Sequence, residues 1–435
     1  MIKKLLAIIL AGVMSMSIMT GCGSSNSQTD SSTESGPVEI EFWYSGGKTA
    51  VHVVQEIIDN FNESQDDYCV TAVTQASYTE TYQKLQAGIA GKAAPDLVLL
   101  DASTCEILYD KGLVETLNSY MDADTGFSRE DYVPVFFDSG VSENGDIFAM
   151  PAYGTTQVLY YNMEAFNKAG VNPDEIKTWQ DLAAAAEKIK AEGYTFGWEP
   201  MWGYGNLVDA VYSNNGTILS EDGTKVTINS PEWVEVWEAF RGWIHDDKTM
   251  GIHFGGQGWE YWYATIDDVL QNKAGGYTGS SGDQADLDFS IVAAMEQPAW
   301  DEDSTSAPMA STLSLSVIGS SSDKEKQGAY EFMKYFANPE NQVKWTMATG
   351  YIAVNTGIQD NEAYKDYVAE NPHALVPFAQ AQHASSYPDD PTNGAITDAL
   401  EIAADKIEID GISAKEALDE AQATAQAALD KALGK

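Results

Sequence analysis

Apolar and polar positions between residues 38 and 100 switch repeatedly between the strand period and the helix period. Val51, Val54 and Ile57 follow helical spacing, so they predict one face of an amphipathic helix. The run 97–100 is continuously apolar, which predicts a strand buried on both faces. The expected elements alternate along the chain: strands at 38–44, 68–75 and 97–100, and helices at 48–63 and 79–91.

This β-α-β-α-β order predicts a parallel sheet joined by right-handed crossovers, and therefore an α/β fold. In sheets of this kind, ligands bind beyond the carboxyl ends of the strands. The segments at those ends are 44–48, 77–78 and 101–104, and we expect ligand-contacting groups there.

Strand and helix patterns continue to the C-terminus. We expect Pro151 to end a strand, because proline cannot donate to a strand ladder. Thr178 is a candidate N-cap, and Asp222-Gly223 is a candidate hairpin turn. The later elements are expected as follows: strands at 147–150, from Gln157 and at 313–318, a hairpin at 220–228, and helices at 163–169, 179–192, 231–245, 323–337 and from Ser413 onward.

The N-terminal segment is typical of an exported protein. Two lysines precede an apolar run, 5–19, that is too short for an ordinary membrane span. The run leads to Cys22 after small residues, which resembles the bacterial lipobox, so we expect a signal peptide at 1–21 and lipidation of Cys22. Residues 23–36 contain no apolar side chain, and 22–36 is therefore interpreted as a lipidated cysteine followed by a flexible tether. This order places the remaining body outside the cell.

The charge composition argues against two classes of binding partner for the chain after the tether. The chain has 24 basic and 66 acidic residues, and Arg129 and Arg241 are its two arginines. This balance opposes binding to nucleic acid, which needs a basic face, and docking on anionic lipid headgroups. A content of 44% hydrophobic and 11% aromatic residues is typical of a soluble globular protein. About 400 residues exceed one ordinary core and suggest two lobes.

Cysteine and histidine offer little sign of special chemistry. Outside the cell, Cys69 and Cys105 either form a disulfide or pack as two free thiols, and the sequence leaves both alternatives open. The five histidines form no HExxH pair, and no spacing resembles a zinc site. We therefore expect no metal and no cofactor.

Motifs along nearly the whole mature chain resemble those of the extracellular solute-binding proteins of bacterial sugar importers, the maltose-binding-like family. The motifs are FWYSGG at 42–47, AGIAGKAAPDLV at 87–98, Met150-Pro151 followed by LYYNM at 159–163, WQDL at 179–182, FMKYF and PENQ within 329–344, and GYIAV at 350–354. Each motif is weak alone, but their order together with the lipoprotein start makes the resemblance specific.

This resemblance implies a two-lobed, type II periplasmic-binding-protein-like α/β fold with the ligand in a cleft between the lobes. The implied boundaries are 37–150 with 314–383 for lobe 1, and 151–313 with 384–435 for lobe 2. The chain should cross between lobes near Pro151-Ala152, near 310–313 and near 383–391. Many relatives carry a Gly-Gly pair before the second crossing, where this chain has Met309 to Thr312.

The implied function is capture of a carbohydrate by a lipid-anchored monomer that delivers it to the permease subunits of an ABC importer, with no catalytic residue. Two alternatives remain. One is a binder of glycerol 3-phosphate or its diesters, although phosphate sites usually use arginine, and Lys48 is the nearest cation by topology. The other is a secreted carbohydrate-cleaving enzyme, which would need two carboxylates facing one bond.

Sugar pockets combine flat aromatic surfaces with polar groups at their rims. The densest such stretch is 196–206, which contains Trp202 and Asn206, and the second is 255–263, which contains Trp259. Trp233, Trp237 and Phe240 are instead expected in the core, because they follow helical spacing. The resemblance adds further candidate ligand-binding residues: Tyr44, Ser45, Tyr78, Asp101, Ser103, Tyr153, Thr155 and Glu199, together with Tyr277, Ser280 and Ser281 from the segment 275–282.

Overall fold

The computed structural model describes residues 36–386, 390–392 and 394–435, and residues 37–435 form one compact unit. The expected signal peptide, Cys22 and the tether up to residue 35 lie outside the described residues, so lipidation stays a prediction. Within the described part of the chain, no helix combines the length and the apolar character needed to cross a membrane.

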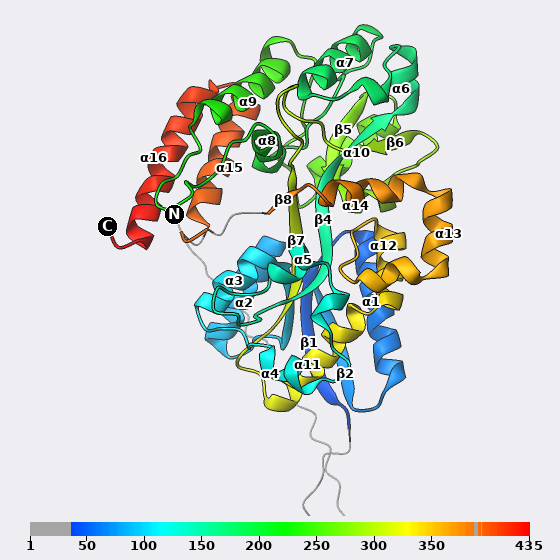
Figure 1. Ribbon diagram of the computed structural model, residues 1–435, viewed down its shortest axis with the longest axis vertical. Coiled ribbons are helices and arrows are strands. Elements are labelled where there is room, and N and C mark those ends of the chain that lie inside the picture. The colour runs from blue at the N-terminus through cyan, green and yellow to red at the C-terminus, as the bar shows by residue number, and fades with distance from the viewer. Residues whose placement is uncertain (1–35, 387–389, 393) are drawn as a thin grey trace, which may run out of the picture. The chain divides into compact units, whose positions relative to one another are not determined.

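Strands and helices alternate in the first third of the unit, and helices dominate the last third (Figure 1). The strands are β1 (Val38–Ser45), β2 (Tyr68–Gln75), β3 (Leu97–Asp101), β4 (Met150–Asn162), β5 (Gly276–Ser280), β6 (Val292–Met295), β7 (Met309–Val317) and β8 (Ser385–Ser386). The helices are α1 (Lys48–Ser64), α2 (Tyr78–Gly91), α3 (Ala102–Asp110), α4 (Asn118–Ala123), α5 (Pro134–Asp138), α6 (Met163–Lys168), α7 (Trp179–Ala191), α8 (Tyr204–Tyr212), α9 (Pro231–Arg241), α10 (Glu260–Leu270), α11 (Asp323–Phe336), α12 (Pro339–Thr349), α13 (Glu362–Glu370), α14 (Val376–Ala381), α15 (Ala395–Glu408) and α16 (Ala414–Ala432).

The strands form a mixed sheet in the order β2-β1-β3-β7-β4-β5, with β6 also paired to β4 and β8 to β7. β1 pairs in parallel with β2 and with β3, as the β-α-β-α-β pattern predicted. β7 is antiparallel to both β3 and β4, so the sheet joins chain segments that are distant in sequence.

The two faces of β3 belong to different apolar clusters. Leu97 and Leu99 pack in the cluster that contains buried residues of α1 and α11, whereas Val98 and Leu100 pack with buried residues of α2 and α3. Helices therefore cover both faces of this strand. Because neither face meets water, the strand is apolar at every position from Leu97 to Leu100, which confirms the prediction from the continuous run.

The predicted strand end at Pro151 is wrong. β4 runs through this proline as a single strand of 13 residues. The pairing of β4 with β7 shifts register between Pro151 and Tyr153, and such a bulge tolerates a residue that lacks an N–H donor. The first half of β4 pairs with β7 and the second half pairs with β5 and β6, so β4 links the two parts of the sheet.

Most other local predictions agree with the structure. Thr178 caps α7 in a reciprocal capping box with Asp181. Gly223 adopts a positive φ of 65° at the predicted turn. The short hairpin is present, with an antiparallel bridge between Leu219 and Val226 and a backbone hydrogen bond from Ser220 N to the carbonyl of Lys225 at 2.8 Å. The helix expected at 231–245 is α9 followed by a π-helical turn, Gly242–Asp246.

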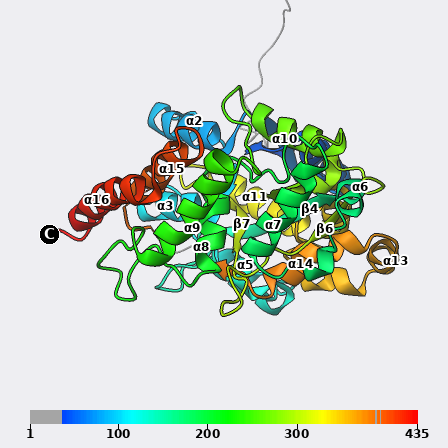
Figure 2. The same cartoon turned by 90° about the horizontal axis from the view of Figure 1, so that it is seen from above.

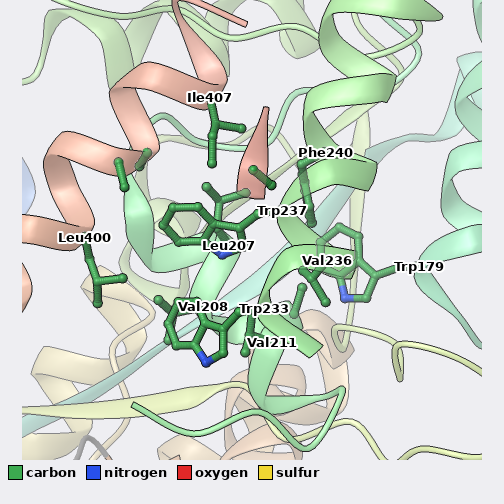
Figure 3. Packing of buried hydrophobic residues seen from close by; sticks show 14 of the residues in the cluster. Trp179, Leu207, Val208, Val211, Trp233, Val236, Trp237, Phe240, Leu400 and Ile407 are labelled. Carbon is green, nitrogen blue, oxygen red and sulfur yellow. The ribbon is translucent and has the colours of Figure 1, made fainter. Parts of the chain in front are cut away.

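A second large core lies among the later helices. α15 and α16 pack beside α8 and α9, as both views show (Figures 1 and 2). Trp233, Trp237 and Phe240 are fully buried in this core, which confirms their structural assignment (Figure 3). The division into two lobes at the boundaries given above stays a prediction.

Both described cysteines are free thiols, so the disulfide alternative does not apply here. Cys69 is half-buried on β2. Cys105 is fully buried in α3, and burial raises the pKa of its thiol to about 12. Cys105 therefore packs as a small hydrophobic side chain.

Asp209 belongs to α8, and its carboxyl group is buried against the first residue of β7. Its oxygens accept from the backbone N of Met309 at 2.9 Å and from Nε2 of Gln297 at 2.6 Å. Burial raises the pKa of Asp209 to about 7, and these two donors lower it only in part. The group is therefore more readily protonated in the folded chain than in the unfolded chain, where its pKa is about 3.9.

We expect this difference to make stability depend on pH. Between about pH 4 and pH 7 the folded state binds more protons at Asp209, so the free energy of unfolding should fall as pH rises through this window. Asp209→Asn should reduce that fall by about 2.7 kcal/mol between pH 5 and pH 8, because about two pH units of the window, each worth about 1.4 kcal/mol, lie above pH 5. Denaturant titrations at these two pH values measure the difference. Asp66→Asn, at an exposed side chain, is the control. An identical slope in wild type and Asp209→Asn would contradict the assignment.

Candidate functional site

Five of the predicted ligand-binding residues come together in space with one tyrosine that the sequence did not single out. We call this set the tyrosine–serine cluster; it consists of Tyr78, Tyr153, Thr155, Ser280, Ser281 and Tyr351. The first residue of α2, the middle of β4, the end of β5 and the loop after α12 supply these side chains. The sheet topology brings them together, because β4 lies between β7 and β5.

Three tyrosines form the aromatic part of the cluster. The hydroxyls of Tyr78 and Tyr153 lie 3.1 Å apart, and the rings of Tyr153 and Tyr351 have centroids 4.6 Å apart. Burial is the main cause that raises the pKa of all three hydroxyls, so they stay protonated and can donate hydrogen bonds at neutral pH. Tyr78 and Tyr351 are only half-buried, which leaves part of each side chain accessible.

Three aliphatic hydroxyls form the polar part of the cluster. Oγ1 of Thr155 lies 3.2 Å from Oγ of Ser280 and 3.3 Å from Oγ of Ser281. The side chain of Ser280 lies close enough to the Tyr351 hydroxyl to lower its pKa, so the aromatic and polar parts are adjacent. Gly282 packs directly under Tyr351: a Cβ at this position would lie 2.3 Å from Cζ of the ring.

Behind these hydroxyls lies a buried carboxyl, Asp283. Its oxygens accept from Nε1 of Trp262 at 2.8 Å and from the hydroxyl of Tyr277 at 3.1 Å. Burial raises the pKa of Asp283 to about 7, despite these two donors. The predicted residue Tyr277 is itself fully buried, so it contributes to the site by holding Asp283 in place.

One cation stands near the cluster. Nζ of Lys48, the first residue of α1, lies 5.9 Å from the centroid of the Tyr263 ring. Burial raises the pKa of Asp286, and the positive charge of Lys48 partly opposes this effect. The neighbourhood thus offers hydroxyl donors, aromatic faces and the exposed ammonium group of Lys48.

The predicted residues on β1 and after β3 make other contacts. Tyr44 is buried with its ring stacked on Phe42 at 5.2 Å, and the hydroxyl of Ser45 is buried with no hydrogen-bond partner among the described residues. Asp101 caps α3 by accepting from the backbone N of Thr104 at 2.8 Å, and it also accepts from the Ser103 hydroxyl. Ser103 lines a separate cavity of 320 Å³.

The candidates from the two aromatic stretches, 196–206 and 255–263, lie around α8 and α10. Nε1 of Trp202 donates to Asp405 of α15 at 2.8 Å, and its ring meets Tyr261 edge-on at 4.9 Å. Asn206 is buried and donates to the carbonyl of Met201 at 2.6 Å. Trp259 packs edge-on against Trp262, with ring centroids 5.9 Å apart. Among these contacts, only that of Trp259 reaches a residue bonded to Asp283.

Glu199 lies apart from the cluster and is fully buried. His253 and Asp268, rather than the cluster hydroxyls, are the side chains beside its carboxyl group. Burial, followed by the negative charge of Asp268, raises the pKa of Glu199 to about 9.

A family comparison agrees with this architecture. A family model described as "Bacterial extracellular solute-binding protein" matches residues 56–373. The chain belongs to this family. It is therefore a non-catalytic solute-binding protein of an ABC importer that acts outside the cytoplasm, and the enzyme alternative is wrong.

Individual relatives and solved structures show the same fold. The sn-glycerol-3-phosphate-binding periplasmic protein UgpB of Yersinia pestis is 27% identical over 367 residues, which cover 79% of this chain and 80% of that protein. UgpB of Mycobacterium tuberculosis, solved with glycerophosphocholine, superposes with a TM-score of 0.79 at 20% identity, over 92% of this chain and 100% of that chain. A Listeria monocytogenes ABC substrate-binding protein, solved with cycloalternan, has a TM-score of 0.80 at 22% identity, over 92% and 99%. These likenesses confirm the predicted periplasmic-binding-protein fold.

Proposed function

We propose that this protein captures glycerol 3-phosphate or one of its diesters and passes it to the membrane permease of an ABC importer. The observation that carries the proposal is the similarity of 79% of the chain to proteins named for binding sn-glycerol 3-phosphate. The tyrosine–serine cluster supports it, because protonated hydroxyls can donate to phosphate oxygens and Lys48 supplies a positive charge nearby.

We place the ligand against this cluster, between the two lobes expected from the sequence. Tyr78 and Tyr351 come from the segments assigned to lobe 1, and Thr155, Ser280 and Ser281 come from those assigned to lobe 2. A solute that contacts both sets would favour the closed arrangement by its differential affinity. In the same proposal, a lipid on Cys22 and the tether 22–36 keep the protein at the outer face of the membrane.

A neutral sugar is the second candidate, and the arginines favour it. Arg129 is paired with Asp138 at 2.5 Å, and Arg241 is paired with Glu238 and Asp246 at 2.5 and 2.6 Å. Neither arginine is free to form the bidentate contact that phosphate sites commonly use. Aromatic rings beside hydroxyls also suit a sugar, whose C–H faces stack on them.

Titration calorimetry at low and moderate salt separates the two candidates. The solutes are sn-glycerol 3-phosphate, glycerophosphocholine, maltotriose and cycloalternan. We expect a phosphorylated solute to bind, and Lys48→Gln to weaken its binding by about 10-fold, which corresponds to one lost charge-assisted contact. Lys324→Gln, at an exposed lysine of α11, removes the same charge and should have no effect.

The contrary result is equally definite. Binding of a neutral oligosaccharide, with no response to either phosphorylated solute, would overturn the first candidate and establish the second. Unchanged affinity for glycerol 3-phosphate in Lys48→Gln would remove Lys48 from the site.

A further inference from the structure

Three side chains that are far apart in sequence meet beside β5. They are Glu199, which follows α7 in the chain, His253 in the loop before α10, and Asp268 in α10. One ligating atom from each lies within 4.8 Å of the corresponding atoms of the other two. Nε2 of His253 stands between the carboxylates, at 3.5 Å from Oε1 of Glu199 and 3.0 Å from Oδ2 of Asp268.

Glu199 is the residue of these three whose buried oxygens lack hydrogen-bond partners among the described residues. It is fully buried, and neither of its carboxylate oxygens has a hydrogen-bond partner among the described residues. Its backbone is fixed on both sides, because its N donates to the carbonyl of Gly276 at 2.9 Å and its carbonyl accepts from the N of Thr278 at 3.1 Å. A buried carboxyl group whose oxygens lack hydrogen-bond partners is unfavourable, and the two backbone bonds keep this one in its position.

Asp268 and His253 already contact each other, and Asp268 also pairs with Lys273, but both side chains can exchange these contacts for bonds to an ion. Oδ1 of Asp268 pairs with Nζ of Lys273 at 2.9 Å, while Oδ2 faces His253. The Lys273 side chain is 49% exposed and can move into water without cost to the core. His253 is 36% exposed, so a solvated ion can reach its ring from outside.

We propose that Glu199, His253 and Asp268 form a binding site for one divalent transition-metal cation of the zinc type. An imidazole nitrogen with two carboxylates is a donor set that suits such ions, whereas calcium and magnesium prefer oxygen alone. Tetrahedral coordination with bonds of 2.0–2.2 Å places neighbouring donor atoms about 3.3–3.6 Å apart. The two separations at His253, 3.5 and 3.0 Å, are close to this spacing, so binding needs only small side-chain movements.

The ion would add side-chain bonds between segments that backbone hydrogen bonds already join at nearby positions, such as Gly251 N to the carbonyl of Trp198 at 3.2 Å. The loop that carries His253 contains Gly255, Gly256 and Gly258, all with positive φ, and its Phe254 is 55% exposed. Its attachment to Glu199 and α10 would hold this loop against β5, whose end supplies Ser280 of the tyrosine–serine cluster. The site is therefore structural, and it lies beside the ligand-binding cluster rather than within it.

The test uses the full-length protein treated with a chelator and then titrated with zinc chloride alone, with no solute present. We expect one equivalent to bind with micromolar or tighter affinity in calorimetry and to raise the melting temperature. His253→Ala should weaken binding at least about 100-fold, more than the loss of an outer-shell partner. His383→Ala is the matched control, because His383 also faces one carboxylate, Glu296, at 2.6 Å but belongs to no three-ligand group among the described residues.

Glu199→Gln is the second variant, and it keeps the shape of the buried side chain while removing its charge. It should fold with a cooperative melt and lose zinc binding, which separates loss of a ligand from loss of folding. Absence of stoichiometric zinc binding by the wild-type protein would overturn the proposal. So would zinc binding that His253→Ala and Glu199→Gln leave unchanged. Neither result depends on which solute the tyrosine–serine cluster binds.

Discussion

Replacing Trp237 with alanine should lower the free energy of unfolding by about 3–5 kcal/mol. Trp237 lies in α9, is fully buried, and has its ring centroid 5.6 Å from that of Trp233. Apolar side chains of α8 and α15, including Leu207 and Ile407, are buried in the same cluster (Figure 3). Alanine would leave a cavity that these helices can fill only in part. Chemical denaturation followed by tryptophan fluorescence and circular dichroism measures the loss.

Two phenylalanine variants test whether the loss comes from packing. Nε1 of Trp237 is buried without a hydrogen-bond partner among the described residues, whereas Nε1 of Trp233 donates to the carbonyl of Thr217 at 2.8 Å. Trp237→Phe removes an unpaired donor, so its cost should be small. Trp233→Phe should cost about 1 kcal/mol more, because it also removes a hydrogen bond. Equal losses for Trp237→Phe and Trp237→Ala would contradict the packing explanation, because phenylalanine keeps much of the buried ring volume that alanine removes.

Local patterns predicted the parallel part of the fold well. β1, β2 and β3, with α1 and α2 between them, follow from the period of apolar residues, which acts within a few residues. The cap of α7 at Thr178 is an equally local signal. The path of β4 through Pro151 could not be predicted in this way. It depends on the register that β4 adopts against β7, a strand from a distant part of the chain.

The candidate site was predictable only where local signals marked its residues. Strand ends and the family resemblance pointed to Tyr78, Thr155 and Ser280, which the sheet brings together. Tyr351 carries no local signal beyond its place in the motif GYIAV, because its role depends on packing against Gly282.

Carboxyl groups were the least predictable part of the site. The chain has 66 acidic residues, so sequence alone cannot tell a buried carboxyl from a solvated one. Asp283 differs from the others only because Trp262 and Tyr277 surround it in the folded chain. The expectation of no metal rested on local spacing, and local spacing cannot detect Glu199, His253 and Asp268, which lie on three separate segments.

Gly282→Ala should weaken solute binding by about 10–100-fold, or roughly 1.4–2.7 kcal/mol, while the protein stays folded. A Cβ at this position would lie 2.3 Å from Cζ and 2.7 Å from the hydroxyl oxygen of Tyr351, so the ring has to move. That movement would separate Tyr351 from Tyr153, whose ring centroid is 4.6 Å away, and from the side chain of Ser280. Calorimetry with whichever of the four test solutes binds the wild-type protein measures the effect.

Gly91→Ala is the matched control, because no atom lies within 4 Å of a Cβ at that position and its backbone is not left-handed. It should keep both affinity and melting temperature. Tyr351→Phe refines the result, since it keeps the ring over Gly282 but removes the hydroxyl beside Ser280. A loss of affinity in both Gly282→Ala and Tyr351→Phe would place the solute at the hydroxyl, and a loss in Gly282→Ala alone would place it against the ring. Full affinity in both variants would show that the tyrosine–serine cluster is not the binding site.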